Sequence, residues 1–369
     1  MRDLFRPNPY VYWTDFLLSI AVGGGCFWLS RRAAPYSAGQ ILAALAACFA
    51  YYRAASFIHE LTHLPKDSFR AFRVAWNVLC GIPFFTPSFL YYKHLAHHSR
   101  KHYGTHDDGE YLPLGVRPRR EILKYLAQPF LIPLLGVLRF LVFTPLSWAS
   151  PRLRRIVQQR ASSLVMDPGY VRPLPNRVER RAWRVQEATC FLYGLAATIL
   201  FATSRLPMSL LAQGYFTALV VLFVNHVRTL GAHRFRHDGE PLTFVDQLLD
   251  SVNYPRWPLT SELWAPVGLR FHALHHLFPS LPYHALPEAH LRLMRQLPSD
   301  SPYRLTESTG LWASLRELWH AAATEQAADN QTRLDWQVVS GTSETGQEDR
   351  QRSTNPVSPK TDRPARLVM

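Results

Sequence analysis

The sequence has few cysteines and few acidic residues. Its 369 residues include only 4 Cys, which lie far apart in apolar runs. A disulfide scaffold, a CxxC zinc knuckle and a haem attachment site are therefore excluded. Asp and Glu number 27 against 41 Lys and Arg, giving a net charge of +14, whereas His is abundant at 16. Such a histidine excess is typical of a protein that binds a metal through nitrogen.

Charged residues are missing from several long apolar runs. A helix that crosses a bilayer needs about 20 mostly apolar residues. A weaker run at 125–151 contains Arg139 and several prolines, and 74–92 is expected to be re-entrant or interfacial because it contains Pro83 and Pro87. Buried helices of a soluble protein would seldom repeat such runs, so we expect an all-α, multi-pass membrane protein. Its four long spans are predicted at about residues 14–31, 38–57, 187–204 and 207–227.

The positive charge predicts how these spans are oriented. Lys and Arg are concentrated between the second and third predicted spans, and such residues mark cytoplasmic loops. Both termini and this middle region are therefore placed in the cytoplasm, with the short loop at Arg31 and Arg32 as an exception. No cleavable secretory signal is evident. We expect an inner-membrane protein in a bacterium or an endoplasmic reticulum protein in a eukaryote, and nucleic-acid binding is not needed to explain the charge.

The histidines fall into clusters with helical spacing. His59 and His63 are four residues apart at the end of the second span, which places them on one face of a helix. Two HxxHH motifs and a solitary histidine follow in the predicted cytoplasmic segments, so separate chain regions are expected to converge on one site. These further positions are His94, His97, His98, His233, His272, His275 and His276.

Nine clustered histidines are too many ligands for one metal ion and suit two. Zinc has no redox chemistry, whereas iron with nitrogen ligands and open positions binds and reduces O2. We therefore infer a non-haem di-iron centre. One HxxxH motif often arises by chance, but chance does not explain both HxxHH motifs on the same side of the predicted membrane. His290 and His320 are interpreted as ordinary packing or surface residues.

Other polar residues near these motifs are candidates for additional ligands or for groups that hold the ligands. His102 and His106 continue the four-residue steps of the motif, but Gly104 argues against a continuous helix, so we expect a supporting or surface position. Metal-bound imidazoles usually bind a carboxylate or carbonyl through the second ring nitrogen. The carboxylates near the motifs that could bind such a nitrogen are Glu60, Asp107, Asp108, Glu110 and Asp238. His237, one turn after His233, has an ambiguous role.

At these motifs the sequence resembles the membrane fatty acid desaturase family, which includes hydroxylases and carotenoid ketolases. The resemblance covers about residues 10–295 and implies four transmembrane helices beneath a cytosolic cap that holds two irons, with a narrow tunnel for an acyl chain. It implies that all nine clustered histidines are ligands. The matching segments are His59 to His63, His94 to Pro113, Asn225 to His233 and His272 to Pro282.

The resemblance also gives a domain organisation. The expected parts are a cytosolic N-terminus at 1–13, a desaturase-like domain at 14–295, a C-terminal cytosolic helix region at 296–322 and a disordered polar tail at 323–369. Relatives often have an Asn one turn before the solitary ligand. Here Thr229 occupies that position and Asn225 lies one turn earlier, so Asn225 or His226 is an alternative source of a tenth or water-mediated ligand.

The activity implied is O2-dependent desaturation of an acyl-lipid or acyl-CoA at an unactivated methylene, with lipid hydroxylation or ketolation as the alternative within the family. Two electrons must come from a separate ferredoxin, rubredoxin or cytochrome b5 with its reductase. The sequence has neither the His-Pro-Gly-Gly motif of a fused cytochrome b5 nor an FAD or NAD fingerprint. A basic cytosolic face would attract such acidic carriers.

Two other classes of function compete with this interpretation. The segment His59 to His63 fits the HExxH motif of a zinc protease, with Glu60 as the general base. That reading leaves both HxxHH motifs unexplained. A non-enzymatic metal transporter would place its ligands near the bilayer midplane, whereas these motifs lie at helix ends.

Overall fold

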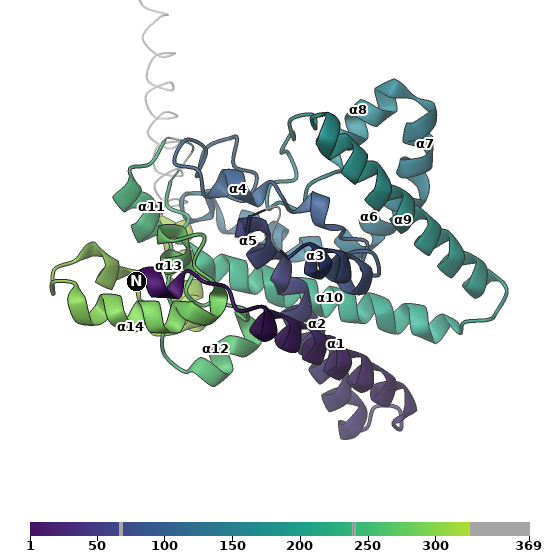
Figure 1. Ribbon diagram of the computed structural model, residues 1–369, viewed down its shortest axis with the longest axis horizontal. Coiled ribbons are helices and arrows are strands. Elements are labelled where there is room, and N and C mark those ends of the chain that lie inside the picture. The colour runs from purple at the N-terminus through teal and green to yellow at the C-terminus, as the bar shows by residue number, and fades with distance from the viewer. Residues whose placement is uncertain (66–68, 238, 240, 325–369) are drawn as a thin grey trace, which may run out of the picture.

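The computed structural model describes residues 1–65, 69–237, 239 and 241–324 (Figure 1). The predicted Asp238 and nearly all of the polar tail lie outside these residues. Within the described part the chain is helical and β pairing is limited to isolated bridges, which confirms the all-α prediction. A helical segment at 311–324 ends the described chain. The labelled α-helices are α1 (Pro9–Arg32), α2 (Ala38–His63), α3 (Arg70–Trp76), α4 (His94–His97), α5 (Arg119–Ala127), α6 (Ile132–Leu138), α7 (Thr144–Ala149), α8 (Pro151–Arg160), α9 (Arg177–Ala202), α10 (Met208–Ala232), α11 (Phe244–Asp250), α12 (Pro258–Trp264), α13 (His272–Leu277) and α14 (Leu286–Gln296).

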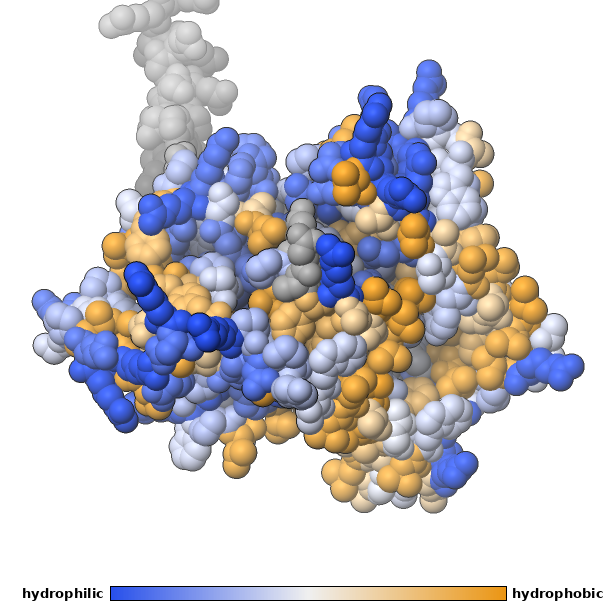
Figure 2. All heavy atoms as spheres, in the orientation of Figure 1, coloured by the Kyte–Doolittle hydropathy of each residue, from blue (hydrophilic) through white to orange (hydrophobic). Residues whose placement is uncertain are grey.

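Four helical stretches of the described chain are long and apolar enough to cross a membrane. They are α2, α9, α10 and the stretch Ile132–Ala149, in which a π-helical turn, η6 (Arg139–Phe143), joins α6 to α7. Three of them correspond to the predicted spans at 38–57, 187–204 and 207–227. Figure 2 shows hydrophobic side chains gathered on the lower right of the molecule, over α1, α2 and the outer parts of α9 and α10, with hydrophilic groups at the connecting tips.

The predicted span at 14–31 is not among these four stretches. This region forms the 24-residue α1, which packs along α2 and is less apolar than the four. Asp15 and three consecutive glycines at 23–25 lower its apolarity. The weaker run at 125–151 supplies the fourth stretch instead. Its η6 turn lies directly before Pro145, whose missing N–H interrupts regular α-helical bonding.

Arg139, the charge inside this fourth stretch, is buried and neutralised. Its guanidinium pairs with Glu187 of α9, and the Glu187 carboxylate also forms an ion pair with Arg154 at 2.7 Å. Glu187 is fully buried, so the two arginines compensate a carboxylate that water does not reach. A charge that weakened the sequence prediction therefore ties η6, α8 and α9 together.

The segment 74–92 is not a single helix. It begins at the end of α3, passes through the π-helical turn η2 (Asn77–Gly81), bends at Phe85 with φ 53°, and continues into the short η3 (Ser88–Leu90). Pro83 and Pro87 lie on either side of that bend. This broken course is consistent with the predicted re-entrant or interfacial segment.

The long helix α2 contacts both α10 and the short helix α4, and its end packs against α13 (Figure 1). A core of fully buried side chains, including Phe57 of α2, Phe72 of α3 and Leu274 of α13, fixes α13 against the end of α2. A second core around Tyr103, Leu230 and Phe235 packs the end of α10 against the chain that follows α4. Every histidine motif therefore lies at a packed junction of helices.

Candidate metal centre

Four chain segments present the nine predicted histidines. His59 and His63 occupy the last turns of α2, the first HxxHH motif forms α4 and its C-cap, and the second lies within α13. His233 follows the last residue of α10. Backbone pairing fixes these segments relative to one another, because His233 bridges to Ser251 and Asn253 bridges to Phe271, the residue before α13. The histidines are therefore held by short hydrogen-bonded segments as well as by helices.

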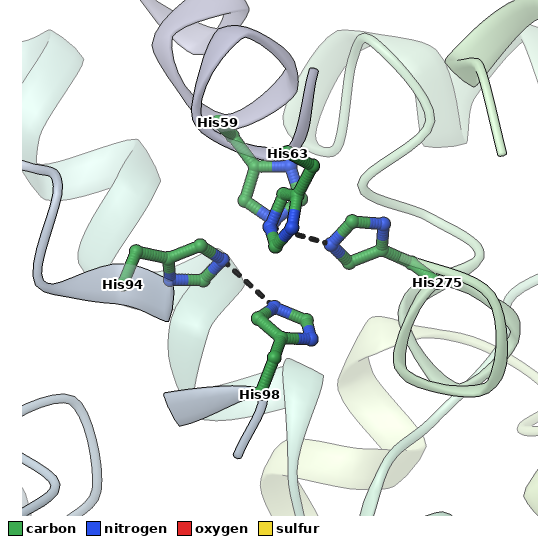
Figure 3. A group of neighbouring side chains, drawn as sticks. All are labelled: His59, His63, His94, His98 and His275. Carbon is green, nitrogen blue, oxygen red and sulfur yellow. Dashed lines mark hydrogen bonds between the residues drawn. The ribbon is translucent and has the colours of Figure 1, made fainter. Parts of the chain in front are cut away.

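The structure sorts these histidines into two groups, and within each group one ligand atom per residue lies within 4.8 Å of the others. The first group, shown in Figure 3, has five rings from α2, the α4 segment and α13 that point toward a common centre. The second group has four rings. The first group contains His59, His63, His94, His98 and His275, and the second contains His97, His233, His272 and His276.

Both HxxHH motifs are divided between the two groups by the same rule. On a helix, residues four apart differ in direction by about 40°, whereas the third residue points about 60° to the other side. His94 and His98 accordingly stay together while His97 joins the second group. His272 and His276 likewise stay together while His275 joins the first group. Each motif therefore gives a pair to one group and a single ring to the other.

The distances between ring nitrogens suit metal ions better than hydrogen bonds. Nε2 of His233 lies 3.1 Å from Nε2 of His97 and 2.9 Å from Nε2 of His272. A neutral imidazole has one N–H, so the His233 ring cannot form hydrogen bonds through Nε2 to both His97 and His272 while its Nδ1 is also bonded. Two nitrogens bound at about 2.1 Å, at right angles around one ion, would be about 3 Å apart. The convergence of lone pairs therefore fits a cation.

In the first group, buried ring nitrogens also lack partners. His94 and His98 approach through their Nε2 atoms at 2.9 Å, and His63 and His275 do so at 3.1 Å. Both ring nitrogens of His59 are buried without a hydrogen bond in the described structure. Unbonded buried polar atoms are costly unless something binds them. The donor set therefore fits a metal ion that accepts imidazole nitrogen.

Carboxylate and hydroxyl groups contact three of the rings at Nδ1. Nδ1 of His94 lies 2.7 Å from Glu110 Oε2, and Nδ1 of His97 lies 2.8 Å from Asp108 Oδ2. These contacts place the ring proton on Nδ1 and leave Nε2 free to bind a metal. The structure thus brings Asp108 and Glu110 into the supporting role expected of carboxylates near the motifs.

His233 is supported by residues that sequence reasoning did not assign. Its Nδ1 lies 2.8 Å from the Tyr103 hydroxyl, which donates to Asp250 Oδ2 at 2.7 Å, and 3.4 Å from Asp250 itself. Asp250 is 2% exposed. It ends α11, seventeen positions beyond His233, a separation with no helical meaning. Only the folded chain brings it to the ring.

Burial keeps most of these imidazoles uncharged. Burial, reinforced by the surrounding imidazoles, lowers the pKa of His98 and of His276 well below the usual value. Burial also disfavours charge on His97, but the nearby carboxylates, chiefly Asp108, outweigh it and raise the pKa of that ring. Burial raises the pKa of Glu110 to about 8. Neutral imidazole is the form that binds a metal, and a bound cation would favour the ionised carboxylate.

Several predicted residues lie outside both groups. His102 is partly exposed, 3.4 Å from Asp107, and His106 has a side chain that is 90% exposed, so both belong to the surface. His237 is half-buried, and its backbone N–H faces the hydroxyl of Tyr111 at 3.4 Å. These histidines are neither members of a group nor partners of one.

The Glu60 carboxylate accepts a hydrogen bond from Tyr12 of α1 and belongs to neither group. Its two neighbours in the HExxH motif, His59 and His63, lie among five histidines, where a zinc protease would need one further ligand. The expected supporting role of Glu60 toward a ring is not found. The geometry therefore gives no support to Glu60 as a general base.

The three residues considered for a tenth ligand also lie outside the groups. Asn225 Oδ1 accepts from Arg228 at 3.0 Å, and the Thr229 hydroxyl donates to the backbone carbonyl of Asn225 at 2.8 Å. His226 Nδ1 faces the Leu222 carbonyl at 2.8 Å, and its ring stacks on Tyr125. All three side chains are engaged within α10 or with α5.

Comparison with known proteins agrees with these motifs. The profile of the family described as fatty acid desaturase matches residues 35–307. A ceramide hydroxylase from Caulobacter vibrioides (strain NA1000 / CB15N) is 40% identical over 327 residues, which cover 88% of this chain and 93% of the relative. No solved structure matches the chain significantly.

Proposed function

The chain belongs to the fatty acid desaturase family, and we propose that it is a membrane-bound di-iron oxidoreductase that uses O2 to oxidise an unactivated C–H bond of a lipid. The observation that carries the proposal is the division of nine clustered histidines, six of them buried, into two metal-sized groups. One iron would be held by the group of five and the other by the group of four. Iron bound there supplies the oxygen chemistry that acid–base residues cannot provide for such a bond.

The surrounding residues would orient the ligands and keep bulk water away. Asp108 and Glu110 fix the directions of His97 and His94, while the Tyr103 and Asp250 pair fixes His233. Six of the nine ligand candidates are buried, and the other three are half-buried. A ligand shell with little freedom can hold two ions without reorganising when the substrate arrives.

Hydroxylation of a ceramide is the first candidate reaction. The printed name of the relative supports it, because the identity extends over nearly the full length of both chains. In hydroxylation one oxygen atom of O2 enters the C–H bond and the other leaves as water, which requires two electrons and two protons. Desaturation, expected from the sequence motifs, becomes the second candidate and is supported by the family profile.

The electrons would come from a separate carrier of the ferredoxin, rubredoxin or cytochrome b5 type. We place the site on the cytoplasmic side, where such carriers and their reductases are found. The concentration of Lys and Arg between α2 and α9 supports that side.

Lipid analysis tests the proposal directly. The chain is expressed in a ceramide-producing host together with electron donors, and total lipids are compared by mass spectrometry with those of a host expressing His97→Ala. A ceramide heavier by one oxygen atom supports hydroxylation, and an acyl chain lighter by two hydrogen atoms supports desaturation. Lipids identical to those of the His97→Ala host, from a folded protein that contains two irons, refute the proposal.

A further inference from the structure

Arg228 is a buried cation that forms no ion pair among the described residues, although its charge acts on Glu110. It lies near the end of α10 and is 9% exposed. One of its amino groups donates to Asn225 Oδ1 at 3.0 Å, but its Nε is buried and has no hydrogen-bond partner in the described structure. Within the described residues no carboxylate pairs with it. A guanidinium carries five N–H donors, and leaving them unbonded away from water is costly.

The buried Arg172 donates to the backbone carbonyls of Phe89 and Ser162, whereas the buried Arg139 and the half-buried Arg53 are paired with carboxylates. Arg139 pairs with Glu187, and Arg53 binds Asp15 at 2.6 Å and Glu262 at 2.9 Å. These residues tie helices together. Arg228 instead faces the neutral amide of Asn225 and the hydroxyl of Tyr52, and its buried Nε has no hydrogen-bond partner within the described chain, so that donor is available to a ligand.

The position of Arg228 connects it with the candidate metal centre. Arg228 lies five residues before His233 of the second group, in the last turns of α10. This end of α10 packs against α5, where the ring of His226 stacks on Tyr125. Arg228 is therefore next to the place where an acyl chain would be oxidised.

We propose that Arg228 binds the carbonyl oxygen at the head of the acyl substrate, an inference that rests on the proposed lipid oxidation. An acyl chain is apolar except at its head, and an amide or thioester carbonyl is an uncharged acceptor that matches the free guanidinium donors. Fixing this oxygen fixes which carbon faces the metal centre. Arg228 is then a substrate-binding residue that sets both affinity and the position of oxidation.

Two lipid classes contain this carbonyl, namely ceramides and acyl-CoA thioesters. The test measures KM, kcat and the position of oxidation for each class with purified, iron-loaded wild type, Arg228→Met and Arg228→Lys. A thioamide ceramide, in which sulfur replaces the acceptor oxygen, serves as the weak-acceptor substrate. Arg31→Met is the control, because Arg31 also contacts α10 but does so at the opposite end, through Gln213 at 3.0 Å.

Hydrogen bonds to a charged group are strong enough that Arg228→Met should raise KM for the oxygen substrate about ten- to hundredfold. The oxidation should spread over several carbons, while the iron content stays unchanged. Arg228→Lys should restore part of the affinity. Wild type should prefer the oxygen ceramide over the thioamide, and Arg228→Met should lose that preference. The class whose KM responds identifies the source of the carbonyl.

The proposal is overturned if Arg228→Met keeps the wild-type KM and position of oxidation for both lipid classes. It is also overturned if wild type has the same KM for the thioamide and for the oxygen ceramide. This comparison does not depend on the folding of any variant. An iron-loaded wild type that oxidises no lipid refutes the proposed function instead, so the two failures are distinguishable. A matching rise in KM for Arg31→Met would assign the effect to general disturbance of α10 and also overturn the proposal.

Discussion

Replacing Asp108 by Asn tests whether the carboxylates behind the rings tune metal binding. Asp108 is 3% exposed, and its Oδ2 accepts from Gly104 N at 3.0 Å and contacts His97 Nδ1 at 2.8 Å. Its Oδ1 accepts from Glu110 N at 3.0 Å. In Asp108→Asn, the side-chain oxygen can still accept from Gly104 N. The amide NH2 then faces the Glu110 N–H, so two donors oppose each other, and the negative charge is lost.

Loss of such a supporting carboxylate typically lowers metal affinity about 10- to 100-fold, which corresponds to about 1.4–2.7 kcal/mol. The loss should fall on the four-histidine group that contains His97. The assay is anaerobic titration with ferrous iron, together with the iron content of the purified protein. We expect Asp108→Asn to bind one iron with wild-type affinity and the other more weakly.

The neighbouring Asp107 provides a matched control. Its side chain is 56% exposed and faces the surface residues His102 and His106. Asp107→Asn removes the same charge one position away and should bind both irons like wild type. The reasoning is refuted if folded Asp108→Asn binds both irons normally, or if Asp107→Asn weakens iron binding equally.

Two further substitutions separate the groups and the competing classes of function. His97→Ala and His275→Ala should each abolish lipid oxidation and lower the iron content, because each removes a ring from a different group. The substitution His320→Ala, at an exposed residue, should change neither property. Retained activity in His97→Ala or His275→Ala would contradict the proposed site. Glu60→Gln should retain measurable oxidation, because Glu60 contacts Tyr12 and belongs to neither metal group. Its stability to heating should fall, since the buried Tyr12 hydroxyl loses a charged acceptor worth about 1.5–3 kcal/mol. Complete loss of activity with both irons bound would restore Glu60 as a proton-transfer group.

Helical spacing was enough to find the histidines but not to assign them to groups. His59 and His63, or His94 and His98, share a face whatever the tertiary structure is, because residues four apart do so on any helix. The assignment of His97 to the group of His233 depends on how α4 is placed relative to the residue that follows α10. The four-residue steps to His102 and His106 do not continue on one helix, because the chain leaves the helix after α4, and both residues lie at the surface, one of the two positions expected for them.

Hydropathy was a reliable guide where composition alone decides. The apolar runs that became α2, α9 and α10 need no partner to be recognised, since the bilayer requirement is a matter of length and charge. The run at 125–151 was discounted because of Arg139 and its prolines, although Ile132–Ala149 is as apolar as α2, and in the fold Arg139 is paired with Glu187. A one-dimensional scale has no means of recognising that pairing.

The sequence by itself determined the helical membrane class, the family and the nine clustered histidines, because these follow from apolar length and from periodicity along one chain. The tertiary structure decided which rings share a group and which carboxylates support them. It also left the Nε of the buried Arg228 without a hydrogen-bond partner among the described residues. Those properties depend on which distant segments meet in space, as when Asp250 reaches His233 through Tyr103. No local pattern encodes such a meeting, since packing of the helices produces it.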